Sequence, residues 1–231
     1  MDAPAEAHVA IVTGANHGIG AAVATALARR GCAVLCAYRR AEGPADPNLP
    51  EAYHRDRAAD AAAVLAEIRA GGGRALAVEQ DLRDPGAAGV LFDAAEAELG
   101  PVDILVNNAS GWVADTFVPV PQDRHGRSLR PVTADSWSAQ FAVDAMAPAL
   151  LIAEFARRHA ARGATWGRVV GLTSGGPDGF PQEVSYGAAK AAQENYTMSA
   201  AAELAGLGIT ANMVHPPVTC LLYTSPSPRD S

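Results

Sequence analysis

Basic residues are in the minority in this chain of 231 residues. There are 18 Lys and Arg against 25 Asp and Glu, a formal net charge of −7. That shortage argues against nucleic acid or an anionic membrane surface as the main partner. The sequence also lacks an apolar run of the roughly 18 residues that a membrane span needs, and acidic residues precede its first predicted strand where a signal peptide would be basic, then apolar. These absences favour a cytoplasmic protein.

Cysteine is scarce too, with only Cys32, Cys36 and Cys220. Cys32 and Cys36 would lie on one strand without the paired spacing of metal ligands, so we interpret them as small core residues and expect no metal site. The hydrophobic content of 49% is enough for a sizeable core. It fits one α/β domain.

The N-terminal region has the pattern of a strand, a glycine turn and a helix. His8–Thr13 is a short apolar run, and residues 19–30 form an alanine-rich helical stretch. Gly14, Gly18 and Gly20 lie between and at the start of these elements, where missing side chains let the backbone approach a pyrophosphate at the helix N-terminus. The spacing favours a dinucleotide-binding turn, and a tight turn without a ligand is the alternative.

The second predicted strand, residues 33–37, ends in Tyr38, Arg39 and Arg40. An acidic side chain at this point would accept hydrogen bonds from a ribose 2′-hydroxyl and repel a 2′-phosphate, whereas arginine does the reverse. The sequence therefore predicts a preference for NADP(H) over NAD(H). The alternative is that both arginines are solvated loop charges.

Further strands and helices alternate along the chain. We expect helices over 55–70, 85–99 and from Thr133 or Asp135 onward, with strands over 75–79, 102–106 and 209–214. The helix after Thr133 would turn an apolar side to the core, made of Trp137, Phe141, Met146, Leu150 and Leu151. Residues 41–54 and 111–132 are rich in Pro and Gly and should be long loops, the second of which would line a substrate cleft with Trp112 and Phe117.

A serine, a tyrosine and a lysine are spaced so that one carbonyl group could meet all three. Ser174 follows a short buried strand, at the carboxyl end where open α/β sheets bind ligands. Tyr186 and Lys190 are four residues apart on a predicted helix from 184 to about 205, so they share a face. An ammonium stabilises a nearby phenolate, and a serine hydroxyl can polarise a substrate oxygen. Alone, a Tyr and a Lys four residues apart more often mean a packed ring beside a solvated charge.

With these motifs, residues 8–219 resemble the short-chain dehydrogenase/reductase family. The resemblance implies that hydride passes between NADP(H) and a carbonyl or alcohol substrate, with Tyr186 as proton donor, Ser174 orienting the oxygen, and Lys190 binding ribose and tuning Tyr186. Asp144 stands where relatives have an Asn that supports a proton-relay water through its backbone carbonyl. Relatives also pair through helices corresponding to 135–160 and 184–205, so we expect a homo-oligomer.

The resemblance also implies a set of cofactor contacts. Asp81 would contact the adenine, although an Asx-turn role is an equal alternative, and His17 stands where many NADP-dependent relatives have Arg. Ser110 departs from the family's Asn-Asn-Ala-Gly, and Pro217 from its Pro-Gly-x-x-Thr. The full expected set is Thr13, Gly14, His17, Gly18, Ile19, Gly20, Arg39, Asp81, Leu82, Asn107, Ala109, Tyr186, Lys190, Pro216 and Thr219.

The predicted fold is a doubly wound Rossmann-type parallel sheet with strand order 3-2-1-4-5-6, lacking the family's final helix and seventh strand. We expect an incomplete reductase domain over 1–219. Residues 220–231, CLLYTSPSPRDS, resemble a translated transposase-type sequencing adapter and are interpreted as a non-native tail. Two alternatives to an enzyme are a dinucleotide-binding regulatory or sensor protein without turnover, and a fragment without a competent site.

Overall fold

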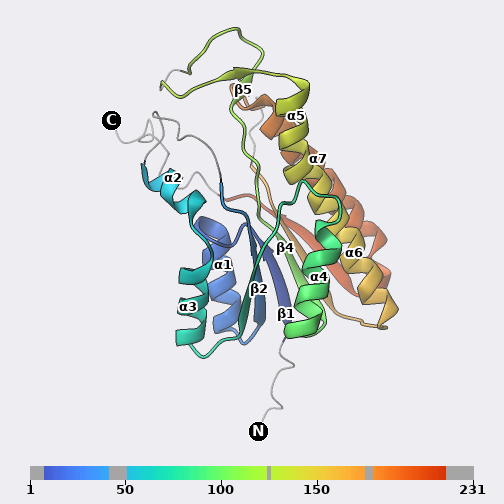
Figure 1. Ribbon diagram of the computed structural model, residues 1–231. Helices are drawn as coiled ribbons and strands as arrows, with labels where there is room; N and C mark the ends of the chain where they lie inside the picture. Colours follow the sequence, from blue (N-terminus) through green and yellow to red (C-terminus); the bar gives the residue numbers. More distant parts are fainter. Residues whose placement is uncertain (1–7, 42–50, 124–125, 175–178, 217–231) are drawn as a thin grey trace.

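The centre of the protein is a six-stranded parallel sheet. The computed structural model describes residues 8–41, 51–123, 126–174 and 179–216 (Figure 1). The strands lie in the order β3-β2-β1-β4-β7-β8. They are β1 (Val9–Thr13), β2 (Ala33–Tyr38), β3 (Ala75–Glu79), β4 (Val102–Asn107), β7 (Gly167–Leu172) and β8 (Ile209–Val214). Near-continuous apolar runs such as VAIVT in β1 and AVLCAY in β2 suit strands that are covered on both faces.

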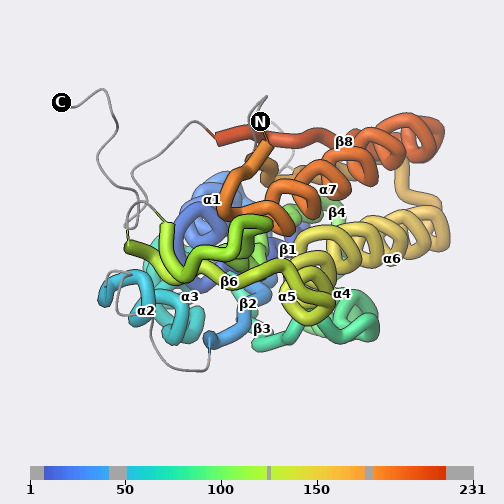
Figure 2. The backbone as a smooth tube through the Cα atoms, turned by 90° about the horizontal axis from the view of Figure 1, so that it is seen from above, coloured from blue at the N-terminus to red at the C-terminus, as the bar shows by residue number. Residues whose placement is uncertain are grey.

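Helices cover both faces of this sheet, as the view from above shows (Figure 2). On one face α1 (Gly18–Arg29) and α3 (Ala62–Ala70) enclose a core that includes Val34 and Cys36. The opposite face is covered by α4 (Ala87–Glu98), α6 (Ala147–Ala161) and α7 (Val184–Glu203). A short 3-10 turn, η2 (Ala205–Leu207), leads from α7 into β8. The interpretation of Cys32 and Cys36 as core residues is confirmed, since both are free and buried.

The strand order differs from the expected 3-2-1-4-5-6. Two short strands, β5 (Asp115–Thr116) and β6 (Arg130–Pro131), lie inside the region predicted as loop and pair with each other outside the main sheet. The last two strands of the main sheet are therefore β7 and β8. Two-residue strands are too short to show a period in the sequence. Two predictions concern the chain beyond Pro216, which lies outside the described residues. They are the absence of a seventh strand and the end of the reductase domain at residue 219.

The helix predicted over 55–70 is instead two helices, α2 (Glu51–Ala58) and α3. They are separated at Asp60, whose Oδ1 accepts a hydrogen bond from the Ala62 N–H at 2.9 Å. A carboxylate that accepts from a helix's first N–H groups favours a new start at that point. This local hydrogen bond interrupts a stretch whose composition is helical throughout.

A long helical segment runs from Ala134 to Ala161 through α5 (Ala134–Phe141), a π-helical turn η1 (Ala142–Met146) and α6. Thr133 caps it as predicted, in a reciprocal capping box with Ser136. The segment is long and apolar enough to cross a membrane by length and composition. However, α6 packs Leu151 and Phe155 into the core beside the sheet, as core helices of globular proteins do.

The apolar side predicted for this helix is wrong at its beginning. Trp137 is 50% exposed, whereas only one buried residue of α5 and η1, Ala145, is apolar and three are polar: Ser136, Gln140 and Asp144. Their spacing of four residues places them on one face. This polar face, Ser136–Gln140–Asp144, is turned toward the site described below.

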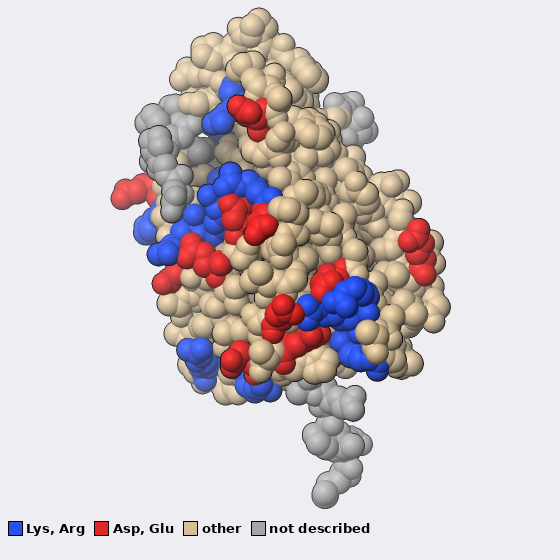
Figure 3. Space-filling view, turned by 45° about the vertical axis from the view of Figure 1, so that its right-hand side comes forward, with Lys and Arg blue, Asp and Glu red and all other residues tan. Residues whose placement is uncertain are grey.

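Charged side chains on the outer surface are mixed in sign. In Figure 3, Lys and Arg groups lie next to Asp and Glu groups on the face shown. Arg158, for example, contacts Asp93 at 2.6 Å and Glu96 at 2.5 Å. Such pairing interrupts any extended basic surface on this face.

Candidate active site

The glycine turn between β1 and α1 needs glycine at three positions, for two different reasons. Gly14 and Gly18 have φ angles of +65° and +58°, which L residues rarely adopt. A Cβ on Gly20 would lie 2.1 Å from the Gly14 carbonyl oxygen. Gly14 and Gly20 are thus needed for packing within the protein, whereas the space beside Gly18 is open. That these glycines bind a pyrophosphate stays a prediction.

The first turn of α1 is open to an anion. His17 is its N-cap residue but makes no side-chain capping bond, so the N–H groups of the first turn, including that of Ile19, are not capped by it. Burial, and then the charge of Arg57, lower the pKa of His17. This lower pKa favours the uncharged form of His17, whereas the Arg found at this position in many NADP-dependent relatives is charged.

Thr13 and Asn108 fasten this turn to the end of β4. Thr13 Oγ1 accepts hydrogen bonds from the N–H groups of Asn108 and Ala109, each at 3.0 Å. Asn108 Nδ2 donates to the carbonyls of Thr13 at 2.8 Å and Gly14 at 3.1 Å. Asn108 was not among the predicted site residues, although its position in the Asn-Asn-Ala-Ser run was a signal for this function.

Three charged side chains gather beyond the end of β2. Arg39 contacts Asp81 at 3.2 Å, and Arg83 contacts the same carboxylate at 2.6 Å. Hydrogen bonding from Arg83 lowers the pKa of Asp81. The Arg83 N–H also donates to Asp81 Oδ1 at 3.0 Å, so the Asx-turn interpretation of Asp81 holds in this structure. Leu82 is buried in the core, which leaves only its backbone for a cofactor contact.

Arg40 is not a free loop charge either. Its guanidinium pairs with Glu79 at 2.7 Å, and that hydrogen bond lowers the pKa of Glu79. Both arginine side chains are partly exposed, Arg39 at 44% and Arg40 at 55%, but Arg39 shares its carboxylate partner with Arg83. Of the two arginines that follow Tyr38, Arg39 is the one whose partner is already balanced by another cation.

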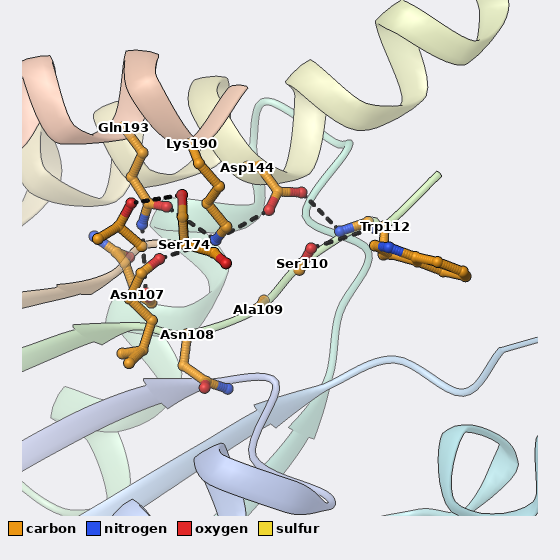
Figure 4. A network of polar contacts seen from close by, with 12 residues as sticks. Asn107, Asn108, Ala109, Ser110, Trp112, Asp144, Ser174, Lys190 and Gln193 are labelled. Carbon is orange, nitrogen blue, oxygen red and sulfur yellow. Dashed lines mark hydrogen bonds and ion pairs between the residues drawn. The ribbon is translucent and has the colours of Figure 1, made fainter. Parts of the chain in front are cut away.

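Tyr186 and Lys190 lie on one side of α7, and Ser174 follows the end of β7 in the region of Lys190 (Figure 4). Ser174 is half-buried just after β7, and Figure 4 shows it in the same region as Lys190 and Asn107. Lys190 Nζ lies 5.7 Å from the centre of the Tyr186 ring, and Phe180 packs edge-on against that ring at 5.5 Å. The predicted neighbours on the helix thus do share a face.

The ammonium group of Lys190 is almost fully buried, with 3% of its side chain exposed. Nζ donates to the Leu172 carbonyl at 3.0 Å and to Gln193 Oε1 at 3.1 Å, and pairs with Asp144 Oδ1 at 3.1 Å (Figure 4). Only the first two contacts have hydrogen-bond geometry, and Asp144 Oδ1 has no hydrogen-bond partner within the described residues. Two of the three N–H donors of the ammonium are therefore used, and the third can serve the expected contact to a ribose.

Asp144 is completely buried beside Lys190. Its other oxygen accepts hydrogen bonds from the Gly111 N–H at 2.7 Å and from Gln140 Nε2 at 2.6 Å. It lies in the π-helical turn η1, and such turns are frequent at functional sites. The residue that departs from the family's Asn thus compensates the charge of the lysine.

Asn107 has a buried side chain, 2% exposed, at the end of β4. The backbone carbonyl of Asn107 accepts a hydrogen bond from Gln193 Nε2 at 3.4 Å. Within the described residues, however, the side-chain oxygen and nitrogen of Asn107 have no hydrogen-bond partner. Buried amides normally have partners, so a water or a ligand is expected there. This observation and the glycine turn both fit a dinucleotide in the site.

Residues 111–123 and 126–132 belong to the segment predicted to line a substrate cleft, and Asp115 within it contacts Ser185 at the start of α7. Phe117 is 81% exposed, so it is not a core residue. Trp112 lies near Tyr53, with ring centres 6.3 Å apart. Burial raises the pKa of Glu183, and a hydrogen bond from Trp112 partly opposes that effect. Thr219 and Pro217 lie outside the described residues, and Pro216 lies just beyond β8.

Comparisons with known proteins agree with this geometry. The short chain dehydrogenase family model matches residues 8–224. The chain is 32% identical over 211 residues to a 3-oxoacyl-[acyl-carrier-protein] reductase of Synechocystis sp., covering 91% of this chain and 73% of that protein. It is 35% identical over 209 residues to a cis-4-hydroxycyclohexanecarboxylate dehydrogenase of Sinomonas cyclohexanicum, covering 90% and 72%.

A solved structure of a similar protein has a similar fold and contains a bound cofactor. The crystal structure of a 3-oxoacyl (acyl-carrier-protein) reductase from Agrobacterium tumefaciens C58 with NADP bound has a TM-score of 0.71 and 31% identity, and the match covers 90% of this chain and 69% of that one. With a family model matched over nearly the whole described region, the chain belongs to the short chain dehydrogenase family, whose members bind a nicotinamide dinucleotide.

Proposed function

We propose that the protein is an oxidoreductase that transfers a hydride between NADP(H) and a carbonyl or alcohol substrate. The observation that carries this proposal is the buried ammonium of Lys190, 5.7 Å from the ring centre of Tyr186 on the same face of α7. A bound nicotinamide would supply or accept the hydride. The protein's own residues would supply the proton and hold the substrate.

Tyr186 is the proposed general acid and base. When the substrate is reduced, the Tyr186 hydroxyl donates a proton to the substrate oxygen, and the Lys190 ammonium stabilises the phenolate that remains on Tyr186. Ser174 donates a hydrogen bond to the same oxygen and polarises the carbonyl. Asp144 holds Lys190 in place through the ion pair at 3.1 Å.

The proposed cofactor site runs along the carboxyl ends of the strands. The backbone at Gly14, Gly18, Ile19 and Gly20 would hold the pyrophosphate at the positive end of α1. Thr13 fixes this turn, and Ala109 and the orphaned amide of Asn107 border the nicotinamide end.

The preference for NADP(H) is supported by Arg39. It follows β2, is partly exposed, and its carboxylate partner Asp81 is also bound by Arg83. The Arg39 guanidinium could therefore leave Asp81 and bind a 2′-phosphate, because Arg83 would still neutralise the Asp81 carboxylate. The similar Agrobacterium reductase has NADP bound.

Replacement of one phenol tests the proposal. Tyr186→Phe should leave the NADPH dissociation constant within about twofold and lower kcat for ketone reduction roughly 10²–10⁴-fold, because only the proton donor is lost. Tyr196→Phe is the matched control, since Tyr196 is on the same helix but 45% exposed. NADPH consumption with a panel of ketones provides the measurement. Tight NADPH binding with no turnover of any ketone would favour the sensor alternative, and an unchanged kcat in Tyr186→Phe would exclude Tyr186 as the acid.

We also propose that the protein forms a homo-oligomer in the cytoplasm. Exposed apolar side chains lie along the helices that pair in relatives, namely Trp137 on α5 and Tyr196 and Met198 on α7. Covering them would favour a homo-oligomer. The acidic composition is compatible with the proposed cytoplasmic location.

A further inference from the structure

Asp115 is a fully buried carboxylate that the reaction outlined above does not use. It lies in the short strand β5, and its exposed fraction is 0%. Oδ1 accepts a hydrogen bond from the backbone N–H of Ser185 at 2.9 Å. Oδ2 accepts from Ser185 Oγ at 2.5 Å and from Ser136 Oγ at 3.0 Å. Both oxygens of this buried anion are therefore directed at hydrogen-bond donors.

These bonds provide the start of α7 with a cap that its own sequence lacks. The N-cap residue of α7 is Glu183, which makes no side-chain capping bond. Ser185 is in the first turn, where N–H groups have no partner within the helix. A carboxylate at that end is also favoured by the helix dipole. Asp115 thus caps a 20-residue helix from a strand 70 residues earlier in the chain.

Tyr186 lies directly after the capped residue and between two buried anchors. Asp115 holds Ser185 on one side of it, and Asp144 holds Lys190 on the other. Both anchors are connected to the polar face Ser136–Gln140–Asp144, because Ser136 donates to Asp115 and Gln140 donates to Asp144. Figure 1 shows β5 and α5 together near the start of α7.

We propose that Asp115 is a positioning residue for the reaction, fixing the first turn of α7 so that the Tyr186 hydroxyl is held at the substrate oxygen. The proposal rests on the function proposed above. A displacement of about 1 Å at a reacting group can reduce a rate about 100-fold. Loss of Asp115 should therefore affect turnover more than it affects cofactor binding, which depends on the glycine turn at the end of β1.

Two substitutions separate positioning from folding. Asp115→Ala removes every acceptor and should lower kcat roughly 10- to 100-fold per NADPH-binding site, with the NADPH dissociation constant within about twofold. Asp115→Asn keeps an oxygen for the Ser185 N–H and should recover most of that kcat. Leu91→Ala, which empties a fully buried position on α4, is the control for stability alone and should leave kcat per binding site unchanged.

A second measurement needs no turnover. Hydrogen exchange at the Ser185 amide should be at least tenfold faster in Asp115→Ala than in the unmodified protein, and close to the unmodified rate in Asp115→Asn. If Asp115→Ala does not fold, Asp115→Asn and Ser185→Ala still test the proposal: exchange at residue 185 must rise more in Ser185→Ala, which loses one of its two bonds to Asp115, than in Leu91→Ala. Unchanged exchange, or unchanged kcat per binding site in Asp115→Ala, overturns the positioning role. A protein that binds NADPH but turns over no substrate overturns the proposed function alone.

Discussion

Removal of Asp144 should destabilise the protein strongly, because it would leave the Lys190 ammonium buried without a counter-charge. The two side chains are 0% and 3% exposed and 3.1 Å apart. Breaking a buried pair by removing one partner costs roughly 3–5 kcal/mol. The Gly111 N–H and Gln140 Nε2 would lose their acceptor as well. We therefore expect Asp144→Ala to lower the free energy of unfolding by an amount in the upper part of that range.

The loss is large enough to measure in two ways. For a domain of this size, 1 kcal/mol corresponds to roughly 2–4 °C in Tm, so a loss of about 4–5 kcal/mol should lower Tm by roughly 8–20 °C. Urea unfolding gives the same free energy from the change in midpoint at constant slope. Asp144→Asn should lower the free energy of unfolding less than Asp144→Ala does, because the side-chain oxygen of Asn can still accept a hydrogen bond from the Gly111 N–H.

An exposed ion pair provides the matched control. Arg29 and Glu67 are 2.9 Å apart with side chains 72% and 55% exposed, so Glu67→Ala should cost less than about 1 kcal/mol. If Asp144→Ala costs no more than Glu67→Ala, the Lys190 charge is not held by Asp144 and our account of the site is wrong.

Three further predictions concern the turn, the cofactor and pH. Gly20→Ala should abolish NADPH binding, because its Cβ would meet the Gly14 oxygen at 2.1 Å, whereas Gly89→Ala, with open space, should bind normally. Arg39→Asp should weaken NADPH binding roughly 10- to 100-fold and spare NADH, and tighter NADH binding by the unmodified protein would contradict the preference. Hydrogen bonds from Arg157 and Arg158 lower the pKa of Glu154 from 4.5 to about 2. Glu154→Gln should therefore destabilise the protein above pH 4.5, and in urea titrations the difference should shrink as pH falls toward 2.

Local patterns in the sequence predicted most of the sheet. β3 (Ala75–Glu79) and β8 (Ile209–Val214) have the expected bounds, and the glycine turn leads into α1 as predicted. Such features depend on the period of apolar residues and on conformations that glycine alone adopts readily, which neighbouring residues determine. The family, and with it the Tyr186 and Lys190 pair on one helix face, could be recognised from the same patterns.

Only the tertiary structure placed the polar groups that act across long separations. The sequence suggested an apolar side for α5, but its buried positions are Ser136 and Gln140, and Asp144 in η1 continues this polar face. It could not show that Asp115 binds a residue 70 positions away, or that Asp144 neutralises Lys190. Burying a carboxylate is costly unless hydrogen-bond donors or a counter-charge are buried beside it, and here these groups lie on elements distant in the sequence. Periodicity therefore determined the scaffold, whereas the charges of the site were decided only when separate segments packed together.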